Sequence, residues 1–177
     1  MASSCVYLPQ ILIAKDPLTA EEHNNLGVAY ENEGKYALAI KEYKKAYNKD
    51  SNLIVPLVNI GNVYLKQANY SEAEKYYLKA LSKDQFNLEA ANNLASLYLL
   101  VGKDYERGLE ILNSAVAYND GFPPQAMDTI GALYSRLGNT EKAKFFLNRA
   151  CKYAKDDKEL TEEINNHLKD LGEGACE

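Results

Sequence analysis

Apolar residues recur along the chain in two alternating helical spacings. The first spacing has offsets of 0, 1 and 4, as in Leu26, Gly27 and Tyr30. The second has offsets of 0, 4 and 7, as in Ala39, Tyr43 and Ala46. Each set falls on one stripe of a helix with 3.6 residues per turn. The pattern therefore predicts pairs of amphipathic helices joined by short turns.

The two-helix pattern repeats. The tyrosine of the first stripe returns at spacings of 34, 34 and 36 residues, as Tyr30, Tyr64, Tyr98 and Tyr134. The last small residue of the second stripe returns at 34, 35 and 35, as Ala46, Ala80, Ala115 and Ala150. The extra residues of the third unit fall in the turn sequences 102–105 and 119–124, where insertion costs little. One hairpin cannot bury its stripe alone, so neighbouring hairpins must stack.

This repeat has a recognisable signature. The pattern LG..Y, followed by A...Y..A and an Asp at the end of the unit, resembles the tetratricopeptide repeat over four units, roughly 20–157. Two family positions differ here: the early aromatic is replaced, as in His23, and the final proline is Ser51 or Gln85. The resemblance implies an all-α, right-handed superhelical α-solenoid of about four helix-turn-helix repeats plus a C-terminal capping helix.

The spacing also sets the boundaries of the units. We expect repeats at 20–53, 54–87, 88–123 and 124–157, an N-terminal segment at 1–19, a solvating helix at 158–172 and a tail at 173–177. Asp16 keeps the spacing of Asp50, but Pro9 falls where Tyr43 lies one period later. The N-terminal segment is therefore predicted to be a degenerate partial repeat. The tail is expected to fray.

The C-terminal helix is predicted from one apolar stripe, formed by Leu160, Ile164, Leu168 and Leu171. Asp157 is suited to cap its start and Gly172 its end. The remaining positions are charged or polar, which is expected of a helix that closes the open end of a solenoid.

Composition narrows the classes of function. The chain has 177 residues and a net charge of −5, with 46% hydrophobic residues. It therefore lacks the basic surface that nucleic-acid binding requires. The longest apolar run, 6–14, is about half of the roughly 18 residues that a membrane span needs.

Cysteine and histidine are scarce. Cys5, Cys151 and Cys176 are far apart and lack metal-site spacing, so we expect no disulfide, and Cys151 to be a small filler. With only His23 and His167, we expect no metal site, no cofactor and no catalytic Cys/His pair. His23 lies at a packing position of its helix. These features favour a protein that is not an enzyme.

The N-terminus has two interpretations. Residues 2–5, ASSC, are similar to the end of a bacterial lipoprotein signal, in which Cys5 carries the lipid. The apolar stretch of such a signal is missing, so an ordinary N-terminus is the alternative. The first implies a periplasmic, lipid-anchored protein and the second a cytoplasmic one. The apolar segment 6–14 is expected either to cover the first repeat or to join two copies as a homodimer.

The resemblance implies that first helices line the concave groove of the superhelix. With Leu26, Ile60, Leu94 and Ile130 as position 7, positions 2, 5, 9 and 12 point away from the packing stripe. The candidate groove residues are Asn24, Asn25, Val55, Val58, Asn59, Asn62, Leu65, Lys66, Glu89, Asn92, Asn93, Ser96, Leu99 and Asp128. Apolar and acidic side chains on this stripe predict a partner that is neutral or basic and partly apolar.

Position 6 holds Asn25, Asn59 and Asn93. An asparagine amide can pair with an extended peptide backbone, which family members use as a ladder. Alternatively, these residues bond to neighbouring units. Groove cations, which bind carboxylate-terminated peptides in some relatives, are absent from position 5, where Asn24 and Val58 stand.

We therefore expect a non-catalytic scaffold that binds a peptide or partner protein. The alternative is an accessory segment of a larger bacterial envelope complex, such as a pilus or outer-membrane lipoprotein assembly, or a regulatory part of an enzyme.

Overall fold

The computed structural model describes residues 16–119, 121–154 and 156–176. Within these ranges the regular elements are all helices, which confirms the all-α prediction. They are α1 (Ala20–Asn32), α2 (Tyr36–Lys49), α3 (Val55–Lys66), α4 (Tyr70–Lys83), α5 (Leu88–Val101), α6 (Tyr105–Tyr118), α7 (Pro124–Arg136), α8 (Thr140–Tyr153) and α9 (Lys158–Asp170). Cys5 and the apolar segment 6–14 lie outside the described residues. None of the described helices is long and apolar enough to cross a membrane.

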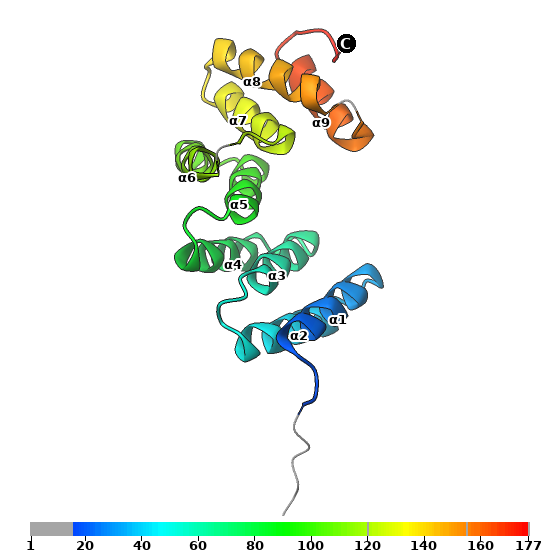
Figure 1. Ribbon diagram of the computed structural model, residues 1–177. Coiled ribbons are helices and arrows are strands. Elements are labelled where there is room, and N and C mark those ends of the chain that lie inside the picture. Colours follow the sequence, from blue (N-terminus) through cyan, green and yellow to red (C-terminus); the bar gives the residue numbers. More distant parts are fainter. Residues whose placement is uncertain (1–15, 120, 155, 177) are drawn as a thin grey trace, which may run out of the picture.

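The helices stack in chain order as pairs (Figure 1). Each helix packs against the next, and each odd-numbered helix also contacts the next odd-numbered one, from α1 to α9. The last helix of the described residues, α9, packs on α7 and α8. The architecture is a helical-repeat solenoid in which α9 occupies the place of a further first helix.

Local sequence sets where the helices begin and end. Thr19 caps α1 in a capping box with Glu22, which satisfies two backbone N–H groups that the helix leaves free. Asp157 caps α9 by accepting from the backbone N–H of Leu160. The turn after α1 places Gly34 at φ +71°, a conformation that glycine adopts without steric cost.

The core runs along the stack because small residues allow the helices of each pair to approach closely. Ala39, Ala73 and Ala143 are completely buried on second helices. Gly27 on α1 lies against the ring of Tyr43 on α2, and Tyr43 is itself completely buried. The repeating small and aromatic positions are thus explained by packing between helices.

The structure corrects the expectation that the cysteines form no disulfide. Cys151 on α8 and Cys176 in the tail are joined by a disulfide, with Cα atoms 5.4 Å apart and a sequence separation of 25. The prediction that Cys151 is only a packing residue is therefore wrong.

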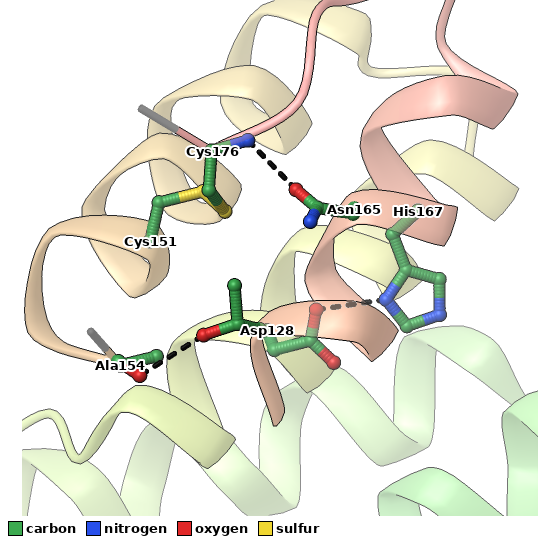
Figure 2. The surroundings of a disulfide bond; sticks show 7 residues. Asp128, Cys151, Ala154, Asn165, His167 and Cys176 are labelled. Atoms are coloured by element: carbon green, nitrogen blue, oxygen red, sulfur yellow. Dashed lines mark hydrogen bonds and ion pairs between the residues drawn. A yellow bond between two sulfur atoms is a disulfide. The ribbon is translucent and has the colours of Figure 1, made fainter. Parts of the chain in front are cut away.

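The tail is held in place by further contacts. The backbone N–H of Cys176 donates a hydrogen bond to Asn165 Oδ1 of α9 at 2.7 Å (Figure 2). Lys144 on α8 forms an ion pair with Glu173 at 2.6 Å. Residues 173–176 are thus tied to both α8 and α9 by the disulfide, the hydrogen bond and the ion pair.

Candidate functional site

The candidate site is the first-helix face, which we define as the surface formed by α1, α3, α5 and α7. The second helices cover one side of each of these helices and leave the other side to neighbouring units and solvent. The predicted groove residues lie on these helices, but their exposure differs widely.

A series of polar contacts joins successive first helices. Asn59 Nδ2 on α3 donates to Asn24 Oδ1 on α1 at 3.0 Å. Asn93 Nδ2 on α5 donates to Asn62 Oδ1 on α3 at 2.9 Å. The hydroxyl groups of Ser96 and Thr129 continue the series between α5 and α7 at 3.3 Å. We call these three contacts the inter-unit ladder.

Second helices brace the same row of polar groups. Asn62 Oδ1 accepts a second hydrogen bond, from the Tyr77 hydroxyl on α4, at 2.8 Å. Glu31 on α1 accepts from the Tyr43 hydroxyl at 2.7 Å and from Lys66 Nζ on α3 at 2.6 Å. Burial and the bond to Glu31 raise the pKa of Tyr43. Tyr43 is therefore a neutral hydrogen-bond donor at physiological pH.

The position 6 asparagines differ in their surroundings. Asn59 and Asn93 bond to the preceding unit, whereas Asn25 is exposed. Asn92, at position 5 of its unit, has its Oδ1 atom buried without a hydrogen-bond partner among the described residues.

Two predicted groove residues are not at the surface. Val58 is 1% exposed and belongs to the core between the second and third units, where Ala90 and Leu94 of α5 also pack. Asp128 is 3% exposed, beside α9. The expectation that both lie free on a groove is wrong, because the next first helix in the stack covers this side of position 5.

The remaining candidates form a mixed surface. Val55 is 44% exposed, and Asn25, Lys66 and Glu89 are exposed as well. The other candidates, which are partly buried, are Asn24, Asn59, Asn62, Leu65, Asn92, Asn93, Ser96 and Leu99. The open part of the first-helix face thus combines apolar, amide and charged groups.

The junction of α7 and α9 differs from the ladder. His167 Nδ1 lies 2.8 Å from Asp128 Oδ1, and the two side chains point toward one another (Figure 2). The hydrogen bond with Asp128 raises the pKa of His167. Glu163, one turn before His167 on α9, lies in the same cluster. The sequence analysis missed this cluster, although Glu163 and His167 are four residues apart, which places them on one face of the helix.

A second titratable cluster lies at the other end of the stack. His23 is completely buried, with Nδ1 2.7 Å from Glu42 Oε2 and Nε2 3.0 Å from Asp16 Oδ2. Lys45 Nζ donates to Glu42 Oε1 at 2.9 Å. The cluster ties α1, α2 and the preceding segment together, which agrees with the predicted packing position of His23.

The fold of the chain resembles the folds of several solved proteins. No curated protein has significant sequence similarity to the chain. The crystal structure of the protein MamA is 21% identical, with a TM-score of 0.65, and the match covers 83% of this chain and 85% of that one. A thermophilic TPR protein from Thermus thermophilus is 19% identical, with a TM-score of 0.71 and coverages of 87% and 84%.

A tetratricopeptide repeat protein from Parabacteroides merdae is 20% identical, with a TM-score of 0.72, and the match covers 89% of this chain and 60% of that protein. At these identities the likeness concerns the fold. Sequence models of the tetratricopeptide repeat match residues 20–53, 56–87 and 124–157. The chain belongs to the tetratricopeptide repeat family, whose members are protein-interaction scaffolds.

Proposed function

We propose that the protein is a non-catalytic scaffold whose first-helix face binds an extended segment of a partner protein. The observation that carries the proposal is the exposure of Val55, at 44%, on a helix whose other apolar residues are buried or partly buried. Val55 shares this face with the partly exposed Leu65 and Leu99, and a group of apolar side chains rimmed by polar residues is typical of a surface that a partner covers.

The chemistry of the surface favours a partner that is neutral or basic and partly apolar. Glu21 and Glu89 are exposed on this face. Lys66 is paired with Glu31 at 2.6 Å, so its charge is already balanced. Acidic groups without such pairing attract basic segments and repel acidic ones.

In this proposal the inter-unit ladder mainly keeps the first helices rigid and contributes little direct contact to the peptide. The amide donors of Asn59 and Asn93 are occupied by neighbouring units, so they hold the spacing of the first helices. Direct contacts to a peptide are assigned to the exposed Asn25, Val55 and Glu89, and to Leu65 and Leu99 beside them.

The proposal is tested by reversing the chemistry of the exposed groups. A double variant, Val55→Glu with Glu89→Lys, replaces an apolar group by an acid and an acid by a base. A matched control makes the same two changes on second helices, as Leu38→Glu with Glu106→Lys, where Leu38 is 41% exposed and Glu106 is exposed.

The probe is a set of random peptides selected on phage against the wild-type chain and then measured by fluorescence polarisation. The first-helix variant is expected to bind about tenfold more weakly, and the control to bind like wild type. Equal binding by all three chains, or equal loss in both variants, would show that the site lies elsewhere.

A further inference from the structure

We propose that Asp128, Glu163 and His167 form a binding site for a divalent transition-metal ion, of the Zn²⁺ type, at the junction of α7 and α9. This inference is independent of peptide binding by the first-helix face. It concerns the end of the solenoid, where the ladder stops and the chemistry of the contacts changes.

The three side chains converge from two helices. One donor atom of each residue lies within 4.8 Å of one donor atom of each of the others. Glu163 and His167 are four residues apart on α9, so they project from the same side of that helix. Asp128 meets them from α7, and its side chain is only 4% exposed.

The donor set suits a borderline metal ion. Imidazole nitrogen together with carboxylate oxygen is a combination that Zn²⁺ accepts, and three protein ligands leave a fourth position for water or a further group. Neighbouring donors around a tetrahedral Zn²⁺ are about 3.3 Å apart, given metal–ligand bonds of about 2.0–2.1 Å. The Asp128–His167 pair must therefore open slightly from 2.8 Å, and Glu163 must close.

The two side chains that must move to bind the ion are Glu163 and His167, and both are accessible to solvent. Glu163 is exposed, and the His167 side chain is 28% exposed. Asp128 is held in the interior and provides a fixed point. Binding of one ion by all three donors therefore requires movement of the two α9 side chains only.

The repeat register shows how the last junction differs chemically from the first. Asp128 and Glu163 each stand 104 residues after a member of the first ladder contact, since 24 leads to 128 and 59 to 163. At the first junction these positions are Asn24 and Asn59, which share a hydrogen bond of 3.0 Å. At the last junction they are two carboxylates, which repel each other when both are ionised. A bound cation removes that repulsion.

Neighbouring charges add to the negative potential of the site. Glu159 and Asp170 of α9 both act on the cluster. Arg136 of α7 lines a small pocket with His167 and Asp170.

The test is a titration of the full chain with ZnCl₂ by isothermal calorimetry, at about pH 8 so that the imidazole is deprotonated. The chain carries Cys5→Ser, which removes a competing thiol, and its disulfide is left oxidised. Bound metal is first removed with a chelator. Co²⁺ is titrated in parallel, because its visible absorption reports the geometry and the type of ligand.

The expected result is one Zn²⁺ per chain, and binding weakened about tenfold or more by Glu163→Gln and by His167→Gln. The matched control is Glu162→Gln, an exposed neighbour on the same helix, which should bind like the parent. Helicity and the thermal midpoint without metal show that each variant is folded; if one is not, the other still tests the site.

Two outcomes would overturn the proposal. The first is a parent chain that takes up no Zn²⁺ or Co²⁺ at concentrations up to ~1 mM, which corresponds to a binding free energy weaker than about −4 kcal/mol. The second is a folded Glu163→Gln or His167→Gln variant that binds as tightly as the control.

Discussion

A Cβ atom placed on Gly27 would lie 2.5 Å from Cδ1 of Tyr43. Tyr43 is completely buried and its hydroxyl is fixed by Glu31, so the ring has no free direction in which to move. The close packing of α1 on α2 in the first hairpin therefore requires glycine at position 27, because any side chain there would meet the Tyr43 ring.

We predict that Gly27→Ala destabilises the protein in spite of the higher helix propensity of alanine. Overpacking against a fixed ring costs about 1–3 kcal/mol, and the propensity gain is about 1 kcal/mol. Urea unfolding followed by circular dichroism should show a lower midpoint. In the control Gly108→Ala, the nearest atom is Tyr98 Cδ2 at 3.3 Å, so a smaller loss or a gain is expected. A midpoint for Gly27→Ala at or above wild type would contradict the prediction.

The inter-unit ladder gives a second prediction. Asn93→Ala removes the hydrogen bond to Asn62, whose Oδ1 still accepts from Tyr77. The loss is expected to be about 1 kcal/mol, the usual net contribution of one hydrogen bond, and to appear as a lower urea midpoint. Asn25→Ala changes an exposed asparagine at the same register position and should leave the midpoint unaltered. Equal effects of both changes would show that the ladder does not couple the units.

The ladder also shows what the sequence can and cannot predict. The period places Asn59 and Asn93 on first helices, and their amides can be expected to bond. Their partners, however, lie 35 and 31 residues away, and the choice between a peptide and a neighbouring unit depends on how the units are rotated. That rotation follows from packing between hairpins, which the pattern within one hairpin does not contain.

A third prediction concerns the disulfide. Replacing Cys176 by serine should destabilise the C-terminal junction by about 3 kcal/mol, because the bond closes a loop of 25 residues that contains α9. Hydrogen exchange should become faster in α9 and stay the same in α1. Reduction of the wild-type protein should reproduce the pattern. Unchanged exchange in α9 would show that helix packing alone holds the C-terminal end.

The acid stability of the first unit gives a fourth prediction. Burial opposes ionisation of Glu42, but hydrogen bonds from Lys45 and His23 outweigh it and hold the pKa of Glu42 below its ordinary value of 4.5. A lowered pKa in the folded state stabilises the protein above the unfolded-state value, and this contribution disappears as the pH falls through the folded-state value.

The thermal midpoint of Glu42→Gln should therefore lie below that of wild type at neutral pH, and the difference should shrink below pH 4.5. The control is Glu33→Gln, because the Glu33 side chain is 55% exposed in its pair with Lys35 and exposed pairs contribute little. A difference that is constant from neutral pH to about pH 3 would show that the Glu42 charge is not responsible.

Two features that the structure shows, the burial of Val58 and Asp128 and the disulfide, depend on contacts between distant parts of the chain. Val58 and Asp128 point away from the packing stripe of their own helices, but α5 and α9 cover them. The pattern within one helix does not contain that contact. The Cys151–Cys176 bond has no spacing motif, since the pairing arises only when the tail folds back across α9. By contrast, the all-α repeat is predictable because each small or aromatic position recurs in phase.

The disulfide has a mechanical consequence. A load applied at Cys176 passes through the sulfur atoms to Cys151 on α8 and bypasses α9, which is spared the tension. The junctions from α1 to α7 are held by packing and by non-covalent contacts such as the Asn59–Asn24 hydrogen bond and the Lys66–Glu31 ion pair. A pulling force on the C-terminal tail therefore acts on these non-covalent junctions before it can act on α9.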